Sequence, residues 1–238
     1  MGNTEQQDII ASGYKLGVAI TELQATSLLD HLGAVLEANN RLNLTAIAER
    51  EQAIRLHIVD SIAVASHVES AEGNIADMGS GAGFPGIPIA IVCHRPVDLI
   101  ESVKKKAAFL EDCVAALCGL WGTNVLAMRA EEVALVRGNG YQHVTARALT
   151  SLPALVELAS PLLVMGGTLW AMKGAPTKQE LESGVRAAGL VGMHEVERLE
   201  YRLPSSDERR MIVAYAKVSE PTIMLPRRVG VAQKRPLA

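Results

Sequence analysis

A glycine-rich segment carries the clearest chemical signature of this sequence. It follows a short apolar run and reads Asp77-Met78-Gly79-Ser80-Gly81-Ala82-Gly83-Phe84-Pro85-Gly86. Glycine lets a backbone turn sharply and approach a ligand closely. Gly81, Gly83 and Gly86 match the dinucleotide-binding spacing G-x-G-x-x-G. The fuller pattern of the segment is an acid, Asp77, followed by glycines at alternating positions. We therefore predict a ligand-binding loop between a strand and a helix.

The acid at the head of this loop indicates the kind of ligand. Asp77 would repel a pyrophosphate, whereas it suits the ammonium and sulfonium groups of S-adenosyl-L-methionine. Glu101 ends the next predicted strand, about 20 positions after Gly79, where an acid can accept hydrogen bonds from ribose hydroxyls. We predict S-adenosyl-L-methionine as the cofactor, held by Asp77, Gly79, Gly81 and Glu101. A nicotinamide oxidoreductase is disfavoured by Asp77 and by the absence of a separate substrate domain.

The elements that must position this loop alternate along the centre of the chain. The expected strands are Asn74–Met78, Val97–Ile100, Asn124–Met128, His143–Ala146 and Thr168–Met172. The expected helices are Gly86–Cys93, Lys104–Cys118, Leu152–Leu163 and Thr177–Ala188. This rhythm predicts an α/β fold with a doubly wound, mostly parallel sheet. Two longer strands, Glu195–Leu203 and Arg209–Val218, are joined by a turn so short that they must pair antiparallel.

The two ends of the chain differ from this pattern. The first 72 residues predict a helical region, with a capping box at Thr21, a helix that ends at Asn39-Asn40 and a second helix from Glu51 to His67. We expect the cofactor domain to span residues 73–218. Residues 219–238 form a basic tail without regular structure, either a solvated end or an arm that touches a polyanion.

Composition excludes several classes of protein. Apolar residues make up 49% and charged residues 21%, which is typical of a globular protein. A net charge of -3 excludes nucleic-acid binding by bulk charge, and 3% aromatic residues disfavour a stacking RNA-recognition sheet. Cys93, Cys113 and Cys118 form no C-x-x-C pair, so we expect three small buried thiols and no metal site. Without a signal peptide or an apolar run of about 20 residues, we expect a cytoplasmic protein with no membrane partner.

The segment after the fourth strand bears on the methyl acceptor. It reads Thr145-Ala146-Arg147-Ala148, and the chain holds neither an Asn-Pro-Pro-Tyr or Asp-Pro-Pro-Tyr motif nor a Pro-Cys or Thr-Cys pair. The first two motifs accept the hydrogens of an exocyclic amine, and the cysteine of the pairs is the nucleophile of pyrimidine C5 methylation. Their absence therefore disfavours both kinds of methyl acceptor. Guanine N7 carries a lone pair and no proton, so alignment alone could supply much of the acceleration. We expect no general base, and we expect Arg147 to orient the cofactor or the guanine edge.

Several segments resemble the RsmG (GidB) family of bacterial 16S rRNA guanine-N7 methyltransferases. The matching segments are Asn43–Ala46, His57–Ser61, Asp77–Pro88, Glu101-Ser102, Lys104–Lys106, Phe109-Leu110, Ala130-Glu131, Ala146–Ala148, Met172–Gly174 and the tail from Pro226. The resemblance implies a class I methyltransferase fold that uses S-adenosyl-L-methionine. It also implies cofactor contacts at Gly79, Phe84, Ala130, Glu131 and Arg147. Thr145 and Met78 depart mildly from the family's usual residues.

The implied substrate is a guanine in the decoding region of 16S rRNA or of the small ribosomal subunit. Candidate RNA contacts are Asn43, His57, Lys104, Lys105, Arg147, Lys173, Arg227 and Arg228. Asn43 also fits a helix cap, His57 fits a core histidine, and the lysines fit a solvated helix face. We expect a monomer. The alternatives are a small-molecule methyltransferase and a non-enzymatic ribosome-assembly factor that retains the cofactor.

Overall fold

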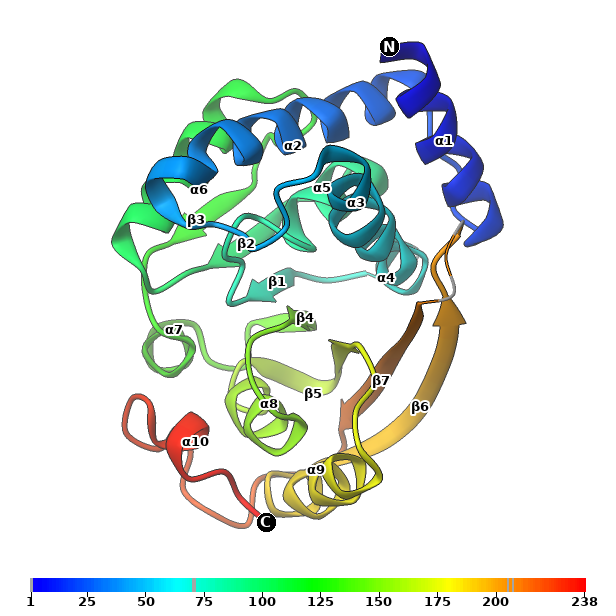
Figure 1. Ribbon diagram of the computed structural model, residues 1–238. Helices are drawn as coiled ribbons and strands as arrows, with labels where there is room; N and C mark the ends of the chain where they lie inside the picture. The colour runs from blue at the N-terminus through cyan, green and yellow to red at the C-terminus, as the bar shows by residue number, and fades with distance from the viewer. Residues whose placement is uncertain (1, 70–71, 205, 207) are drawn as a thin grey trace.

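One seven-stranded sheet forms the centre of the computed structural model, which describes residues 2–69, 72–204, 206 and 208–238 (Figure 1). The strands are β1 (Ile75–Met78), β2 (Val97–Ile100), β3 (Asn124–Leu126), β4 (Tyr141–Arg147), β5 (Leu163–Lys173), β6 (Met193–Arg202) and β7 (Arg209–Lys217). Their order is β3-β2-β1-β4-β5-β7-β6, with β7 antiparallel to both neighbours and the other pairs parallel. The expected fold class, with its terminal antiparallel hairpin, is confirmed.

The strand order determines where a ligand can bind. From β1 the chain winds outward through β2 and β3, and it then returns to add β4 on the other side of β1, with Asp77 paired to Thr145. In open α/β sheets, ligands bind beyond the carboxyl ends of the strands where the winding reverses. The loops after β1 and β4 meet at this point, and they hold the glycine-rich segment and Arg147.

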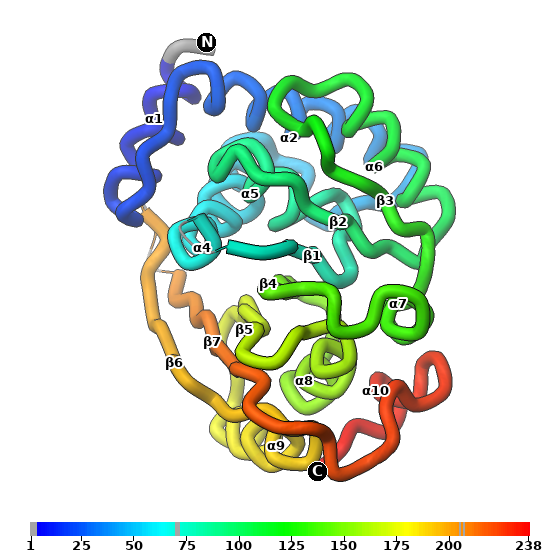
Figure 2. The backbone as a smooth tube through the Cα atoms, turned by 180° about the vertical axis from the view of Figure 1, so that it is seen from behind, coloured from blue at the N-terminus to red at the C-terminus, as the bar shows by residue number. Residues whose placement is uncertain are grey.

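Helices cover both faces of the sheet (Figures 1 and 2). One face carries α1 (Gly2–Lys15), α2 (Glu22–Leu42), α3 (Arg50–Ala53), the π-helix η1 (Ile54–Val59), α4 (Asp60–Glu69), α5 (Gly86–Cys93) and α6 (Lys104–Ala116). The other carries α7 (Ala130–Arg137), α8 (Leu152–Ala159), α9 (Lys178–Leu190) and α10 (Val231–Lys234). Each set buries a hydrophobic cluster against its own side of the sheet.

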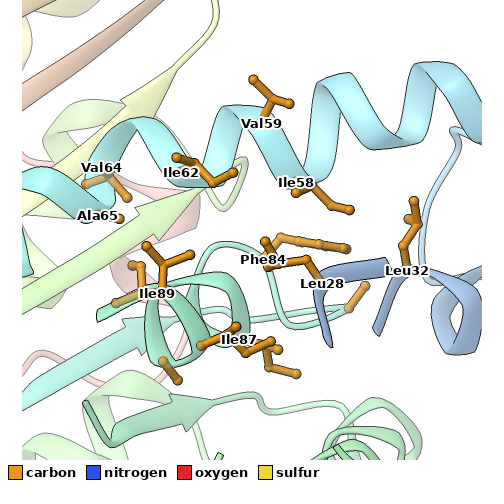
Figure 3. Packing of buried hydrophobic residues seen from close by; sticks show 14 of the residues in the cluster. Leu28, Leu32, Ile58, Val59, Ile62, Val64, Ala65, Phe84, Ile87 and Ile89 are labelled. Carbon is orange, nitrogen blue, oxygen red and sulfur yellow. The ribbon is translucent and has the colours of Figure 1, made fainter. Parts of the chain in front are cut away.

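The N-terminal helices pack against the glycine loop and the sheet. Figure 3 shows Ile58 and Ile62 of the η1–α4 segment facing Phe84 and Ile89, with Leu28 of α2 beside Phe84. These side chains are at most 4% exposed and belong to one cluster with residues of β1, β2 and β5. The N-terminal region therefore forms part of the wall around the loop, and the division at residue 72 stays a prediction.

Several sequence predictions need correction. The first long helix does not end at Asn39-Asn40 but continues to Leu42, where Asn43 adopts a left-handed conformation as C-cap. The expected helix Glu51–His67 is one helical segment whose middle turns are a π-helix, η1. Periodicity alone does not separate π from α turns. The predicted capping box at Thr21 is confirmed.

Two further expectations were wrong. The tail holds a short helix, α10, because Ala232 is buried among the apolar residues beneath α7 and α8. All three cysteines are unpaired, but only Cys113 is buried, whereas Cys93 is half-buried and Cys118 is exposed. Helix α7 was not predicted, because its eight residues have only a weak apolar periodicity.

Candidate functional site

The glycine loop is held at the carboxyl end of β1 by backbone hydrogen bonds. Gly79 and Ser80 both donate their N–H groups to the Ile100 carbonyl of β2, over 2.9 and 3.1 Å. Gly79 has a φ of +77° and Gly81 of +59°, a left-handed conformation that side chains with a Cβ rarely adopt. A Cβ on Gly79 would lie 2.6 Å from Leu149 Cδ1. Close packing therefore explains this glycine as well as ligand approach does.

Asp77 lies beneath the loop and outside the pocket lining. Its Oδ2 accepts the Gly86 N–H at 3.1 Å, and its Oδ1 accepts the Thr145 hydroxyl at 3.0 Å. Burial raises the pKa of Asp77 to about 6, although its hydrogen bonds oppose the shift. We predicted from the sequence that this carboxylate contacts the cofactor. In the structure it instead links the end of β1 to α5 and β4 through these two hydrogen bonds.

Glu101 holds the other side of the same loop. Its Oε2 accepts the Gly81 N–H at 2.9 Å, and its Oε1 accepts the Val103 N–H at 2.7 Å. The residue is buried and lines the pocket. Each carboxylate oxygen has two acceptor positions, so the group can accept further bonds from a ligand. Binding of ribose hydroxyls by Glu101 stays a prediction.

The pocket itself is a cavity of about 360 Å³ at the carboxyl ends of β1, β2 and β4. Its volume falls within the usual range of small-molecule sites, roughly 300–1,000 Å³. The lining includes Gly79, Gly81, Phe84, Glu101, Ala130, Glu131 and Arg147 among the predicted cofactor contacts. The structure thus brings together seven of the eight predicted contacts and leaves out Asp77.

Phe84 lies between two histidines from the N-terminal region. Its ring centroid is 4.6 Å from that of His31 in α2 and 4.8 Å from that of His57 in η1. His31 Nε2 lies 2.8 Å from the Ala82 carbonyl, so the ring donates to the glycine loop. Burial lowers the pKa of each histidine to about 4. Both rings are therefore neutral near pH 7 and restrain Phe84 and the loop.

Arg147 is held by η1. Its Nη1 donates to the Leu56 carbonyl at 2.6 Å, and its Nη2 donates to His57 Nδ1 at 3.1 Å. Its guanidinium carbon also lies 5.4 Å from the centre of the Phe84 ring. π-Helices occur frequently at functional sites. Here the π turns supply two acceptors that fix one guanidinium.

A buried carboxylate completes this arrangement. Asp60 Oδ2 lies 3.3 Å from Arg147 Nη1, while Asp60 Oδ1 accepts the Tyr201 hydroxyl at 2.8 Å and lies 3.6 Å from Arg210 Nε. The side chains of Asp60 and Arg147 are only 8% and 14% exposed. Tyr201 and Arg210 come from β6 and β7, so the terminal hairpin reaches the site through Asp60.

The far end of the pocket is formed by the start of α7 and by the tail. Ala130 and Glu131 line it together with Met128, Leu158 and Gln233. Glu131 Oε1 accepts the Gly230 N–H at 2.7 Å. The tail is therefore hydrogen-bonded to Glu131, which is one of the predicted cofactor contacts.

The predicted RNA contacts lie in different environments. Asn43, Lys104, Lys105 and Arg228 are exposed. Lys173 forms an ion pair with Glu180 at 2.8 Å, and Arg227 forms a double ion pair with Glu157 at 2.5 Å. His57 faces Arg147 and Thr45 rather than solvent. The structure thus gives Lys173, Arg227, His57 and Arg147 partners within the chain, and it leaves the other four open to solvent.

Sequence reasoning missed three residues at the site. His31 lies on the same buried face of α2 as Leu28, Leu32 and Val35. A polar residue on an otherwise apolar helix face is the sequence feature that could have identified it. Asp60 lay within a segment already singled out, but nothing indicated its partners. Gln233 follows an apolar pair in the tail, and no sequence pattern indicated that it lines the pocket, because its position depends on how the tail packs against the rest of the chain.

Among the described residues, no helix is long and apolar enough to cross a membrane. In that part of the chain, no group of three or more His, Cys, Asp or Glu side chains is arranged to hold a metal ion.

Comparison with solved structures supports the fold. The chain has a TM-score of 0.52 to TrmN from Thermus thermophilus, at 15% identity, covering 76% of this chain and 53% of that one. It has the same TM-score, 0.52, to P. horikoshii TYW2 in complex with MeSAdo, at 14% identity, covering 66% and 62% of the two chains. At this identity the likeness concerns the fold alone.

Sequence comparison extends over nearly the whole chain. Proteins named ribosomal RNA small subunit methyltransferase G are 37% identical in Chloroflexus aggregans, over 99% of both chains, and 39% identical in Deinococcus radiodurans, over 93% of this chain and 88% of that one. The model of the GidB family, rRNA small subunit methyltransferase G, matches residues 24–210. The chain therefore belongs to the rRNA small subunit methyltransferase G family.

Proposed function

We propose that this protein transfers a methyl group from S-adenosyl-L-methionine to N7 of a guanine in the 16S rRNA of the small ribosomal subunit. The observation that carries the proposal is the placement of Glu101 and Arg147 at the two sides of the pocket, where the sheet reverses its winding. Membership of the methyltransferase family gives the reaction class.

The pocket residues fit this cofactor. Glu101 offers a buried carboxylate to the ribose hydroxyls, and the glycine loop lets the ligand approach the backbone, since a Cβ on Gly81 would meet no atom closer than 3.9 Å. Glu101 and Glu131 would repel a phosphate, which S-adenosyl-L-methionine lacks. When bound, the cofactor supplies an electrophilic methyl group on a sulfonium, and the acceptor's lone pair forms the new bond as the thioether leaves.

The surroundings of His57 favour an acceptor that needs no proton removed. His57 is the imidazole of the described pocket lining, and both of its nitrogens have partners: Arg147 donates to Nδ1, and Thr45 Oγ1 lies 2.8 Å from Nε2. A ring whose lone pair already accepts a hydrogen bond, and whose pKa is about 4, is a poor general base near pH 7. Guanine N7 has no proton to lose.

Arg147 is the residue placed to orient the reactants. Its contacts with Leu56, His57 and Asp60 fix the guanidinium, while the side chain still lines the pocket. A planar guanidinium can bind a carboxylate, or the O6 and N7 edge of guanine, through paired hydrogen bonds. Holding the reacting atoms in line can contribute about 7–11 kcal/mol to a rate acceleration.

The exposed lysines at the start of α6 are the proposed contacts to rRNA phosphates. Lys104 and Lys105 are exposed, and Lys106 lines the pocket. Each phosphate contact contributes about 0.7–0.9 to the logarithmic salt dependence of RNA binding. We further propose that the protein acts as a monomer in the cytoplasm. Light scattering of the purified protein tests the monomer.

Methyl transfer from labelled cofactor tests the proposal. Purified small subunits, naked 16S rRNA and free guanine nucleotides serve as acceptors, and Glu101→Ala serves as the variant with weakened cofactor binding. We expect label in rRNA from at least one of the first two acceptors. Label in the free nucleotides alone would indicate a small-molecule methyltransferase. Tight cofactor binding without transfer would indicate an assembly factor.

A further inference from the structure

The C-terminal segment 221–238 packs on the side of the molecule formed by α7 and α8 (Figures 1 and 2). Ala232 of α10 is 2% exposed and belongs to the hydrophobic cluster of that face, where Ile223, Leu225 and Leu237 pack against it. The segment is thus part of the folded molecule.

A buried ion pair fixes the middle of this segment. Arg227 donates from Nε and Nη2 to the two carboxylate oxygens of Glu157 in α8, each over 2.5 Å, and the Glu157 side chain is 2% exposed. The hydrogen bonds to Glu157 raise the pKa of Arg227. Arg227 Nη2 also donates to the Arg235 carbonyl at 2.8 Å, which closes the segment around α10. A carboxylate this buried requires a partner, so Arg227 serves the fold.

A second contact directs α10 to the pocket. The Gly230 N–H donates to Glu131 Oε1 over 2.7 Å, immediately before α10 begins. Three residues later in the chain, Gln233 is an exposed residue of the same pocket lining, which also contains Met128, Leu158 and the start of α7. In the described part of the lining, Gln233 is the one side chain that carries an amide.

The two ends of the pocket differ in chemistry. Phe84 at one end belongs to the cluster of the α2 face, and Ala130 at the other belongs to the cluster of the α7 face. Arg147 gives the first end a cation suited to a carboxylate. The lining around Ala130 also holds Met128, Leu158, Gln233 and the charged Arg129 and Glu131. Apolar surface beside polar groups suits a purine ring with a polar edge.

We infer that the C-terminal segment forms one wall of the cofactor pocket and that the Gln233 carboxamide recognises the adenine ring of S-adenosyl-L-methionine. A carboxamide presents a donor and an acceptor side by side, which match N7 and the 6-amino group of adenine. At the same edge hypoxanthine presents two acceptors, O6 and N7, and a carboxamide with one donor and one acceptor cannot pair with both of them. The inference rests on the proposed function, because it takes the ligand from there.

Calorimetry with two ligands tests the role of Gln233. The ligands are S-adenosyl-L-homocysteine and its deaminated analogue, in which hypoxanthine replaces adenine. We expect the unaltered protein to prefer the adenine ligand. Gln233→Leu should weaken its binding by roughly 5- to 100-fold, the range for one lost bidentate pair, and should reduce the preference for adenine. Lys234→Ala, an exposed neighbour in the tail, and Gln179→Leu, an exposed glutamine on α9, should leave both affinities unchanged.

Amide hydrogen exchange gives a second measurement, which does not depend on any variant. If the segment is a wall of the pocket, residues 229–235 should exchange more slowly when S-adenosyl-L-homocysteine is added. Unchanged affinities and preference in Gln233→Leu, or unchanged exchange in the tail, would overturn the inference while leaving the proposed function intact. If the unaltered protein binds neither ligand, the proposed function fails and this inference fails with it.

Discussion

Arg147 donates a hydrogen bond from Nη2 to Nδ1 of His57 over 3.1 Å. Because Nδ1 accepts, the neutral ring carries its proton on Nε2, which donates to Thr45 Oγ1 at 2.8 Å. Burial, together with the nearby charge of Arg147, lowers the pKa of His57 to about 4. The histidine is thus a fixed acceptor that orients the guanidinium, and it is available neither as a base nor as a cation for rRNA.

Replacing His57 separates its hydrogen bonds from its ring packing. His57→Phe keeps an aromatic ring beside Phe84 but removes the acceptor of Arg147 Nη2, while the contacts of Nη1 with Leu56 and Asp60 remain. A hydrogen bond to a charged group contributes about 1.5–3 kcal/mol, so kcat for methyl transfer should fall by about ten- to a hundredfold. Steady-state kinetics measure this effect. His67→Phe, whose ring stacks on Trp170, is the control, and equal activity in both variants would contradict the assigned role.

Asp60 should contribute strongly to stability. Asp60→Asn leaves Arg147 and Arg210 without their shared carboxylate, and breaking a buried ion pair costs about 3–5 kcal/mol in the free energy of unfolding. Tyr201→Phe removes one donor to Asp60 and should cost about 1–2 kcal/mol. Urea denaturation measures both values.

The control for these variants is Glu182→Gln, which breaks an exposed pair with Lys178 and should cost under about 1 kcal/mol. If Asp60→Asn is no more destabilising than Glu182→Gln, then Asp60 does not hold the two arginines.

The sheet and the loops at its carboxyl edge could be predicted because each depends on local sequence. Helix Gly86–Cys93 and strand Val97–Ile100 match the structure residue for residue, since glycine, proline and apolar runs mark their ends. Glu101 was predicted from its position after a strand, and the structure places it in the pocket lining. In such cases the neighbouring residues already determine the conformation.

The partners of the charged side chains could not be predicted, because they depend on contacts between separate elements of the chain. Asp77 looked like a ligand contact, but its partners Gly86 and Thr145 lie on other elements. The partner of Arg227 is Glu157, 70 positions earlier in the chain, so charge alone suggested an RNA-binding arm. Periodicity and motif spacing carry no information about such pairs.

The pKa of His31 predicts a pH dependence of stability. An unfolded histidine has a pKa near 6.5, whereas burial lowers the pKa of His31 to about 4 in the folded chain. As the pH falls, the unfolded state takes up the proton first, so the free energy of unfolding decreases between about pH 6.5 and pH 4. His31→Gln keeps a donor for the Ala82 carbonyl and removes the titration.

Urea denaturation at pH 7 and pH 5 tests this dependence. The unaltered protein should lose roughly 1–2 kcal/mol more stability than His31→Gln over this interval. The opposite contribution of Asp77, whose pKa is raised to about 6, is present in both proteins and cancels in the comparison. An identical loss in the two proteins would mean that His31 is not held in its neutral form.

Glu101 should bind the ribose of the cofactor. Glu101→Ala removes the carboxylate, and binding of S-adenosyl-L-homocysteine should weaken by about 1–3 kcal/mol. A 2′,3′-dideoxyribose analogue should bind the unaltered protein weakly and lose little further affinity in the variant. Calorimetry on this cycle tests the contact. Fully additive losses would mean that Glu101 supports only the backbone of Gly81 and Val103.

The position of the transferred methyl group tests the central claim most directly. N7-methylguanosine carries a positive charge on its ring, so borohydride reduction followed by aniline cleaves RNA at that nucleotide. Methylated 16S rRNA is treated in this way and the cleavage site is mapped by primer extension, with rRNA incubated with His57→Phe as a control of reduced activity. We predict cleavage at one guanine that depends on the protein and on S-adenosyl-L-methionine. Transfer of label to rRNA without such cleavage would contradict guanine N7 as the acceptor.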